Sequence, residues 1–346
     1  MRSSKGTQKP YELQKYNLND VGRSLRTTGM NIAILDDSLN LVRSLSCFAR
    51  VKDRNVTVWS DHTEDTAVLA ERLNETEALV LLRERTPIRA SLIALLPRLK
   101  MITLNGPYPH IDVAACTRHG VVVCSGPPRP SSATAELTWG LILAAMRRIP
   151  QEMGRLKSGQ WQGSVGTGLR GRTLGVYGYG RIGRQVAGFG KAFGMRVLVW
   201  SRESSLAAAR ADGYTAAPSK QALFAEADVL CLHVRLLPET RGTVAAADLA
   251  SMKPTSLFVN TSRAELVEPG ALVNALRAGC PGAAAVDVFE QEPVVDTTLA
   301  LLNMDNVVCT PHLGYVERDQ LDRYFNDQFE RVFAFERGSA VNVVNP

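Results

Sequence analysis

The chain has 346 residues, of which 45% are hydrophobic and 21% charged, and its formal net charge is +6 at pH 7. It is long enough for two domains with sizeable cores, and no apolar run approaches the roughly 18 residues of a membrane span. The first residues lack the apolar core of a secretory signal, so we expect a cytoplasmic protein with no membrane contact. The 6 cysteines form no CxxC pair, which argues against a disulfide framework or a structural zinc site, and we expect no bound metal.

The positive charge is concentrated near the start of the chain. Residues 1–29 carry a net charge of +4, so the remaining chain carries about +2, which is ordinary for a protein that handles small anions. This distribution and the lack of any recognition motif argue against a nucleic-acid partner. Residues 1–29 are polar without clear periodicity, so we expect a flexible N-terminal extension, with a partner-binding arm as the alternative.

From Met30 onward, short β-rich runs alternate with amphipathic stretches. The first block predicts strands at residues 30–37, 55–60, 78–83, 100–105 and 121–126. Strands separated by helices imply parallel pairing in a doubly wound sheet. A proline-rich stretch at 126–132 then leads into an apolar helix predicted over 136–148 and ending at Pro150, and this change of composition marks a domain boundary.

The second block predicts a complete dinucleotide-binding domain. Its Val- and Leu-rich runs predict strands at residues 173–178, 196–201, 228–234, 256–262, 283–289 and 306–312. Helical periodicity returns after His312, and we expect the last residues to dock on the first domain. The predicted fold is therefore α/β, with a doubly wound Rossmann domain at 127–314 inserted into a doubly wound, flavodoxin-like substrate domain at 30–126 and 315–346.

Three glycines follow the first strand of the second block in the pattern GxGxxG. Gly178 permits the tight turn, Gly180 lets the backbone approach a pyrophosphate, and Gly183 lets helix and strand pack closely. The pyrophosphate then lies against the positive end of the helix. Strand, glycines, helix and second strand occur in the right order, so the pattern predicts a dinucleotide site.

The residue that reads the cofactor ribose is not acidic in this chain. Ser201 ends the second strand where Asp or Glu would bind the 2′-hydroxyl of NAD and repel the 2′-phosphate of NADP. Ser201 removes that repulsion, and Arg202 can pair with the phosphate. We therefore expect NAD(P)(H) with a preference for NADP(H), the alternative being that Arg202 is a solvated charge and either cofactor binds.

Three successive strands of the second block end in reactive side chains. The first ends at Arg263, the second is followed by Asp287, Glu290 and Glu292, and the third ends at His312. Ligands bind beyond the carboxyl ends of strands in doubly wound sheets. Arginine can clamp a carboxylate, and histidine beside a carboxylate can transfer a proton near neutral pH. Their convergence beside a dinucleotide loop predicts an oxidoreductase site.

From about Met30 to Pro346 the chain resembles the D-isomer-specific 2-hydroxyacid dehydrogenases, the group of D-3-phosphoglycerate dehydrogenase and glyoxylate/hydroxypyruvate reductase. The resemblance rests on several ordered motifs, namely LGVYGYGRIG, LHVRLLPETRG, MKPTSLFVNTSRAELVEPGALVNALRAG, AVDVFEQEP, TPHLG and the terminal VNP. It implies hydride transfer between a nicotinamide cofactor and a small, anionic D-2-hydroxyacid or 2-oxoacid, and a homodimer. The apolar helix at 136–148 is a candidate for the subunit boundary, although a monomer core would explain it equally.

The resemblance also implies roles for individual residues. His312 becomes the acid/base, Glu292 its partner and Arg263 the substrate anchor, while Asp287 would hold the nicotinamide carboxamide. The residues implied to line the cofactor, besides the glycines and the ribose position, are Arg181, Ile182, His233, Thr261, Ser262 and Gly314. The residues implied to reach the substrate from the first domain are Arg83 and Arg85.

The chain departs from the family pattern in the loop that offers backbone N–H groups to the substrate carboxylate. Pro107 and Pro109 have no N–H to give, so Gly106, Tyr108 or Arg83 must compensate. This departure supports a different class of function, in which the protein is a cofactor-sensing corepressor or scaffold with little turnover. The presence of Arg263, Glu292 and His312 favours the enzyme.

Overall fold

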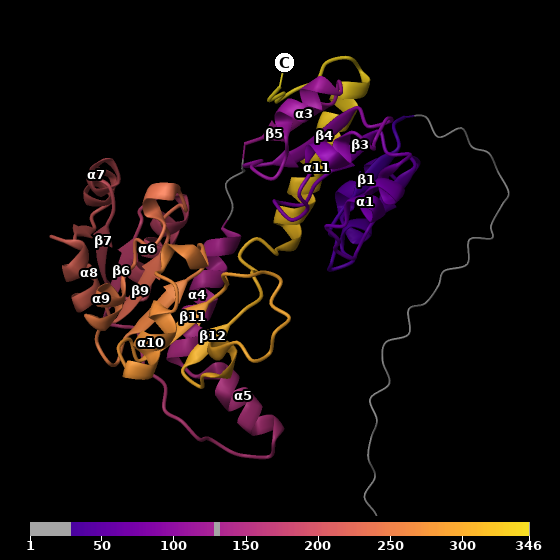
Figure 1. The fold of residues 1–346 in the computed structure, drawn as a ribbon. Coiled ribbons are helices and arrows are strands. Elements are labelled where there is room, and N and C mark those ends of the chain that lie inside the picture. The colour runs from indigo at the N-terminus through magenta and orange to yellow at the C-terminus, as the bar shows by residue number, and fades with distance from the viewer. Residues whose placement is uncertain (1–28, 128–131, 346) are drawn as a thin grey trace, which may run out of the picture.

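The computed structural model describes residues 29–127 and 132–345, and the structural statements below refer to these residues. Nearly all of the predicted extension at 1–29 and part of the proline-rich stretch lie outside them. Two parallel sheets, each with helices on both faces, form two lobes (Figure 1). The predicted α/β class is confirmed. None of the helices in the described part of the chain is long and apolar enough to cross a membrane.

The first sheet has five parallel strands in the order β2-β1-β3-β4-β5, which is the flavodoxin-like order. Its strands are β1 (Ile32–Ile34), β2 (Val56–Val58), β3 (Ala78–Val80), β4 (Met101–Asn105) and β5 (Val122–Gly126). One face is covered by α1 (Thr66–Leu73), α2 (Ala90–Ile93) and α3 (Val113–Arg118). The other face packs on η1 (Val42–Ser44), η2 (Ser46–Arg50) and α11 (Arg318–Glu336).

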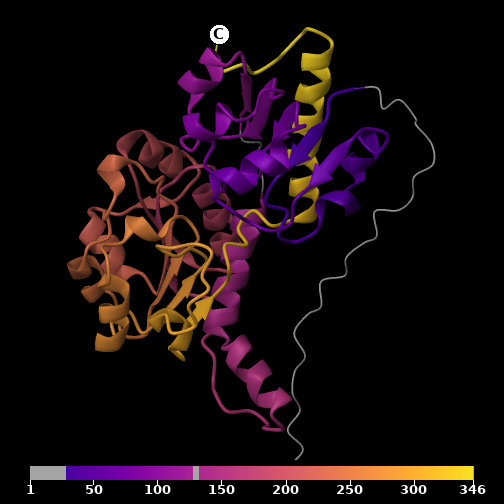
Figure 2. The same ribbon diagram turned by 45° about the vertical axis from the view of Figure 1, so that its right-hand side comes forward.

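The C-terminal part of the chain returns to this first sheet. Phe325 and Phe329 of α11 are fully buried against it, and Figure 2 shows the helix running along the first lobe. Beyond α11, Val343 forms an antiparallel bridge with Cys124 at the edge strand β5. The predicted docking of the tail on the first domain is therefore confirmed.

The second sheet has seven parallel strands in the order β12-β11-β10-β9-β6-β7-β8, the Rossmann order with one added strand. The strands are β6 (Thr173–Tyr177), β7 (Arg196–Trp200), β8 (Thr215–Ala216), β9 (Val229–Leu232), β10 (Leu257–Asn260), β11 (Ala283–Val286) and β12 (Val307–Cys309). The sequence predicted six strands and missed β8, because a two-residue edge strand has no apolar run to reveal it.

Helices cover both faces of the second sheet. One face carries α4 (Ala133–Met146), α6 (Arg181–Ala192) and α7 (Glu203–Ala211), and the other carries α8 (Lys220–Glu226), α9 (Ala246–Ala250) and α10 (Ala271–Ala278). Short 3-10 turns occur at η3 (Pro238–Thr240), η4 (Ala264–Leu266) and η5 (Ala300–Asn303).

The predicted helix end at Pro150 is wrong. The chain turns at Arg148, whose φ is 54°, and a second helix, α5 (Ile149–Lys157), begins with Pro150 in its first turn. Proline fits there because the first N–H groups of a helix have no partner within it. In both views α5 projects away from the two sheets (Figures 1 and 2).

Candidate active site

The glycine loop has the geometry that each glycine was predicted to provide. Gly178 has a φ of 98°, and a Cβ there would lie 2.6 Å from the carbonyl oxygen of His233. A Cβ on Gly183 would lie 2.1 Å from the Gly178 carbonyl oxygen, so only glycine permits this packing of α6 on β6. At Gly180 a Cβ would meet no atom within 4 Å. The space in front of Gly180, at the N-terminus of α6, is therefore open to a ligand.

The neighbouring strand end places Ser201 beside this loop. Its hydroxyl accepts a hydrogen bond of 3.3 Å from the Tyr179 N–H, and the Gly178 N–H donates to the Trp200 carbonyl at 2.8 Å. Arg202 is exposed at the start of α7, and its guanidinium forms no ion pair with any of the described residues. Glu203 is an acidic neighbour, but Arg210 pairs with it at 2.6 Å.

The loop residues fit a nicotinamide dinucleotide. His233 follows β9, and its Nε2 atom is buried without a hydrogen-bond partner among the described residues. Burial lowers the pKa of His233 to about 4, so its imidazole is neutral at pH 7. The His233 backbone lies against Gly178 of the loop, and a buried nitrogen without a partner on such a residue is one that a bound cofactor would satisfy. Arg181 begins α6 with its side chain exposed, and Ile182 packs partly into the core behind the loop.

His312 and Glu292 meet beyond the carboxyl ends of β12 and β11. The His312 Nδ1 atom lies 2.5 Å from Glu292 Oε2, and Glu292 Oε1 accepts a hydrogen bond of 3.0 Å from the Phe289 N–H. Burial alone would raise the pKa of Glu292, but these hydrogen bonds and the charges of His312 and Arg263 hold that pKa below its usual value. The carboxylate fixes Nδ1 of the imidazole as the donor in this pair, which leaves Nε2 for a reacting group.

Asp287 holds the turn that carries His312. Its fully buried carboxylate accepts hydrogen bonds from the Thr310 hydroxyl at 2.6 Å, the Leu313 N–H at 2.7 Å and the Gly314 N–H at 2.8 Å. His312 has a φ of 53°, in the left-handed region that non-glycine residues rarely adopt. The pKa of Asp287 is raised by its burial, against the effect of these hydrogen bonds. A carboxylate has about four acceptor positions, so these three bonds take up most of the hydrogen-bonding capacity of Asp287.

Arg263 follows β10, and the residue that holds it was not predicted from the sequence. The Asn260 side chain is buried, accepts a hydrogen bond of 3.0 Å from the Ser262 N–H and donates one of 2.9 Å to the Arg263 carbonyl. The Asp287 N–H donates to the Asn260 carbonyl at 3.0 Å, which joins the two turns. Because Asn260 lies inside an apolar strand run, its role is visible only once the turn is folded.

Two hydroxyls predicted to line the cofactor bind protein atoms here. The Ser262 hydroxyl donates to the Val234 carbonyl at 2.7 Å and so joins the ends of β10 and β9. The Thr261 hydroxyl lies 2.7 Å from that of Thr138, which itself donates to the Thr134 carbonyl. These side chains fasten α4 and β9 to the end of β10. Gly314 accepts a hydrogen bond of 2.6 Å from the Thr134 hydroxyl.

The first lobe contributes two arginines from the end of β3. Arg83 is half-buried with a φ of 64°, and its N–H donates to the Tyr324 hydroxyl at 3.1 Å. Its guanidinium lies 4.4 Å from the centre of the Tyr315 ring, and Arg85 donates to the Tyr315 hydroxyl. The pKa of Arg83 is lowered, mainly by burial and also by the positive charge of Arg263. The positive charge of Arg263, on the second lobe, therefore acts on Arg83.

The expectation that Gly106 offers its N–H to a substrate is wrong for this conformation. That N–H donates to the Gly126 carbonyl at 2.9 Å, and the Gly106 carbonyl accepts from the Ser125 hydroxyl at 2.6 Å. Gly106, with a φ of 100°, thus ties β4 to β5. Pro107 and Pro109 lack N–H groups, so Arg83 and the exposed Tyr108 remain of the compensating groups expected from the sequence.

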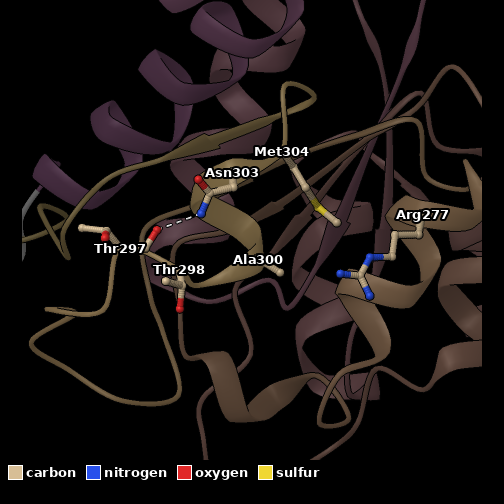
Figure 3. A pocket seen from close by; sticks show the side chains of 6 residues that line it. All are labelled: Arg277, Thr297, Thr298, Ala300, Asn303 and Met304. Carbon is tan, nitrogen blue, oxygen red and sulfur yellow. Dashed lines mark hydrogen bonds between the residues drawn. The ribbon is translucent and has the colours of Figure 1, made fainter.

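A separate groove opens in the second lobe, away from the residues above (Figure 3). It lies between α10 and the segment around η5, where the Asn303 side chain donates to the Thr297 carbonyl at 2.8 Å. Its lining residues are Arg277, Thr297, Thr298, Ala300, Asn303 and Met304. None of them was predicted as a site residue, and they bring no acid/base pair together.

The family model described as "D-isomer specific 2-hydroxyacid dehydrogenase, NAD binding domain" matches residues 139–314. The glyoxylate reductase of Aeropyrum pernix is 37% identical over 304 residues, which cover 84% of this chain and 90% of that relative. The chain belongs to the D-isomer specific 2-hydroxyacid dehydrogenase family.

Solved structures extend the likeness of this family member over both lobes. A putative D-3-phosphoglycerate dehydrogenase from Ralstonia solanacearum superposes with a TM-score of 0.87 and 48% identity, covering 92% of this chain and 97% of that one. The D-lactate dehydrogenase of Aquifex aeolicus, complexed with NAD and lactic acid, has a TM-score of 0.69 and 27% identity over 89% and 96% of the two chains. The predicted Rossmann and flavodoxin-like arrangement and the family resemblance are therefore confirmed, and the cofactor is of the nicotinamide class.

Proposed function

We propose that this dehydrogenase transfers a hydride between a nicotinamide cofactor and a small, anionic D-2-hydroxyacid or 2-oxoacid, working mainly as an oxoacid reductase. The observation that carries the proposal is the 2.5 Å contact between His312 and Glu292, in reach of the charge of Arg263 and at the same carboxyl edge of the sheet as the glycine loop. These groups suit proton transfer and charge stabilisation at one carbonyl. The cofactor-sensing alternative gains no support from the relatives named above.

The chain's own residues then have distinct tasks. When bound, the reduced nicotinamide supplies the hydride that reaches C2 of the oxoacid. His312 donates its proton to the carbonyl oxygen of the substrate, and Glu292 stabilises the imidazolium. Arg263 binds the substrate and stabilises the charge that develops on that oxygen. In the oxidative direction His312 takes the proton back.

The substrate carboxylate would be bound mainly by guanidinium groups. Arg83, Arg85 and Arg263 form no ion pair with an acid among the described residues, so their charges are available to an anion. Because the Gly106 N–H is bonded within the protein, we assign to Arg83 the compensation for the two prolines. Glyoxylate, hydroxypyruvate and their phosphorylated relatives are the substrate types to compare.

For the cofactor we propose a preference for NADP(H). Ser201 removes the carboxylate that would repel a 2′-phosphate, and Arg202 has no internal ion pair to compete with that phosphate. The further contacts proposed on the cofactor are those of the glycines, Arg181, Ile182, His233 and Gly314, with Asp287 at the carboxamide. Thr261 and Ser262 would contribute by holding the strand ends beside it.

We also propose a division into two domains, with boundaries near residues 126 and 314. The two connections are close to each other, since the Thr134 hydroxyl bonds the Gly314 carbonyl at 2.6 Å. A pair of adjacent connections suits closure of one lobe on the other, which would exclude water from the reacting groups. The cytoplasmic location stays a prediction from the sequence.

A homodimer is proposed on different grounds from those that the sequence suggested. The apolar helix α4 packs into the core of the second lobe, where Trp139 and Ile142 are buried. Exposed apolar side chains instead gather on α5 and the segment after it, namely Ile149, Met153, Leu156, Trp161 and Val165. A second copy of the chain would cover them. Scattering at micromolar concentration should give a dimer mass, and Leu156→Glu should shift it towards the monomer.

The proposed activity is tested by initial rates of NADPH and NADH oxidation, measured in parallel with glyoxylate, hydroxypyruvate, pyruvate and a bulkier aryl oxoacid. Turnover with a preference for NADPH supports both the reaction and the cofactor assignment. An NADH preference would contradict the cofactor assignment alone. Cofactor binding without turnover of any oxoacid would contradict the reaction.

A further inference from the structure

Tyr315 contacts three of the proposed site residues at once. It lies one residue beyond Gly314, where the chain leaves the second lobe for the first, and it is 6% exposed. Its ring faces the Arg83 guanidinium at 4.4 Å, its hydroxyl accepts a hydrogen bond from Arg85, and its ring meets that of His312 edge-on at 5.7 Å. It therefore joins the substrate arginines of one lobe to the acid/base of the other.

The ring of Tyr315 makes two of these contacts, and its hydroxyl makes the third. A guanidinium within about 6 Å of a ring face is attracted by the ring's negative quadrupole. The bond from Arg85 to the hydroxyl is charge-assisted, which makes it stronger than a bond between neutral groups. The ring planes of Tyr315 and His312 meet at 79°, which is the edge-to-face arrangement that aromatic pairs favour.

A tyrosine has an advantage over an acid as the partner of these arginines. A carboxylate beside Arg83 and Arg85 would order them but would also neutralise the charge that a substrate carboxylate needs. The phenol and ring of Tyr315 hold both guanidinium groups through contacts without a full negative charge. Among the described residues, no acidic side chain lies within ion-pairing distance of Arg83 or Arg85. The positive charge stays available.

We propose that Tyr315 is a positioning residue that orients Arg83 and Arg85 towards the substrate carboxylate and sets their place relative to His312. This inference rests on the proposed reduction of 2-oxoacids. The hydroxyl acts through Arg85, and the ring acts through Arg83 and His312. Tyr315→Phe therefore removes only the first contribution, whereas Tyr315→Leu removes all of them.

The test combines steady-state kinetics with the binding of oxamate, an unreactive analogue of a 2-oxoacid, to the cofactor-loaded protein. Loss of a charge-assisted hydrogen bond in Tyr315→Phe should raise the oxoacid KM and the oxamate Kd by about tenfold. Its kcat and its Kd for the cofactor should stay unchanged. In Tyr315→Leu kcat should fall as well. Tyr214→Phe, in the second lobe beside Tyr179, is the matched control and should behave as wild type.

A double-mutant cycle separates positioning from a structural role. If Tyr315 acts through Arg85, then Tyr315→Phe should cost nothing further in an Arg85→Gln background. The inference would be overturned if the effects of Tyr315→Phe and Arg85→Gln on KM multiplied as independent effects do. It would also be overturned if Tyr315→Phe lost thermal stability while its KM and oxamate Kd stayed unchanged. Either result would leave the proposed reaction intact. Absence of any oxoacid turnover in the wild type would instead overturn the proposed reaction and this inference with it.

Discussion

The two lobes hold their site residues by different physical means. In the second lobe, buried polar residues at the strand ends fix the turns of the catalytic groups through backbone hydrogen bonds, as Asp287 does for His312 and Asn260 for Arg263. In the first lobe, Arg83 and Arg85 are held by the aromatic residues Tyr315 and Tyr324, which come from the far end of the chain. The turns that carry Arg263 and His312 are thus fixed through their backbone, and the arginines of the first lobe by contacts to side chains 230 or more positions away.

This difference suits the two tasks. A proton donor must be held within a fraction of an ångström of its working position, and backbone hydrogen bonds at a strand end provide that. Arg83 and Arg85 belong to the first lobe, which closes on the second lobe in the proposed mechanism. Tyr315 lies at the connection between the lobes, so its side-chain contacts to these arginines can persist while the lobes close. The predictions below test this division, beginning with the largest expected effect.

Arg263→Gln should lower activity more than the substitutions at Asn260, Ser201 and Glu292. Removing a group that stabilises developing charge typically costs about 10²–10³ in rate, so kcat/KM for the best oxoacid should fall by that factor. Cofactor affinity, measured by titration with NADPH or NADH, should not change. Arg277→Gln is the matched control, since Arg277 lines the separate groove of the same lobe. Equal losses in both variants would contradict the assignment of Arg263.

Asn260→Ala tests whether the backbone bonds of the second lobe hold the catalytic turn. It leaves the Ser262 N–H and the Arg263 carbonyl without their partner, which should lower the free energy of unfolding by about 1–3 kcal/mol. It should also lower kcat, because Arg263 is no longer fixed. Denaturant unfolding and steady-state rates check both effects. Asn274→Ala, at an exposed position of α10, should leave both unchanged, and a stability loss without a change in kcat would refute the link to Arg263.

Ser201→Asp tests the strand end that faces the cofactor. A carboxylate near a 2′-phosphate should weaken binding of 2′,5′-ADP relative to 5′-ADP by about tenfold. Calorimetric titration of the two nucleotides measures this ratio without turnover. Ser201→Ala removes the hydroxyl without adding charge and should preserve the wild-type ratio. If the ratio of the affinities for 2′,5′-ADP and 5′-ADP is the same in Ser201→Asp as in wild type, Ser201 does not face the ribose.

Glu292 should give a small but diagnostic dependence of stability on pH. Its pKa is lowered in the folded protein, so its ionised form stabilises the fold above the unfolded-state pKa of about 4.3. That stabilisation is lost as the pH falls through the lower, folded-state pKa. Urea unfolding of wild type and Glu292→Gln across this range should show a stability difference that disappears on acidification. A constant difference at all pH values would contradict the ionised pair with His312.

Sequence reasoning succeeded where a residue's task depends on its neighbours along the chain. The spacing of Gly178, Gly180 and Gly183 sets a turn, an open approach and a close packing, and all three were found as predicted. Arg263, Glu292 and His312 were found beyond the ends of adjacent parallel strands, where the chain order and the sheet rule together predicted them.

It failed where the task depends on contacts between distant segments. Tyr315 is a single aromatic residue with no periodic pattern around it, and its partners Arg83 and Arg85 lie more than 200 positions earlier, as the separation of 230 residues from Arg85 shows. The Gly106 N–H was expected to be free, but it donates to the Gly126 carbonyl. That bond forms only when β4 and β5 pair, so the sequence around Gly106 does not reveal it. The short strand β8 and the turn at Arg148 likewise arise from packing that the local sequence does not encode.

The most direct test of the central claim is the rate of 2-oxoacid reduction by wild type and by His312→Asn under identical saturating cofactor. Loss of a general acid typically costs about 10²–10⁴ in rate. We expect wild-type turnover of at least one oxoacid, a loss of this size in the variant, and unchanged affinity for NADPH or NADH. A variant as active as the wild type, or a wild type that binds the cofactor and reduces no oxoacid, would contradict the assignment of this site as a 2-oxoacid reductase centre.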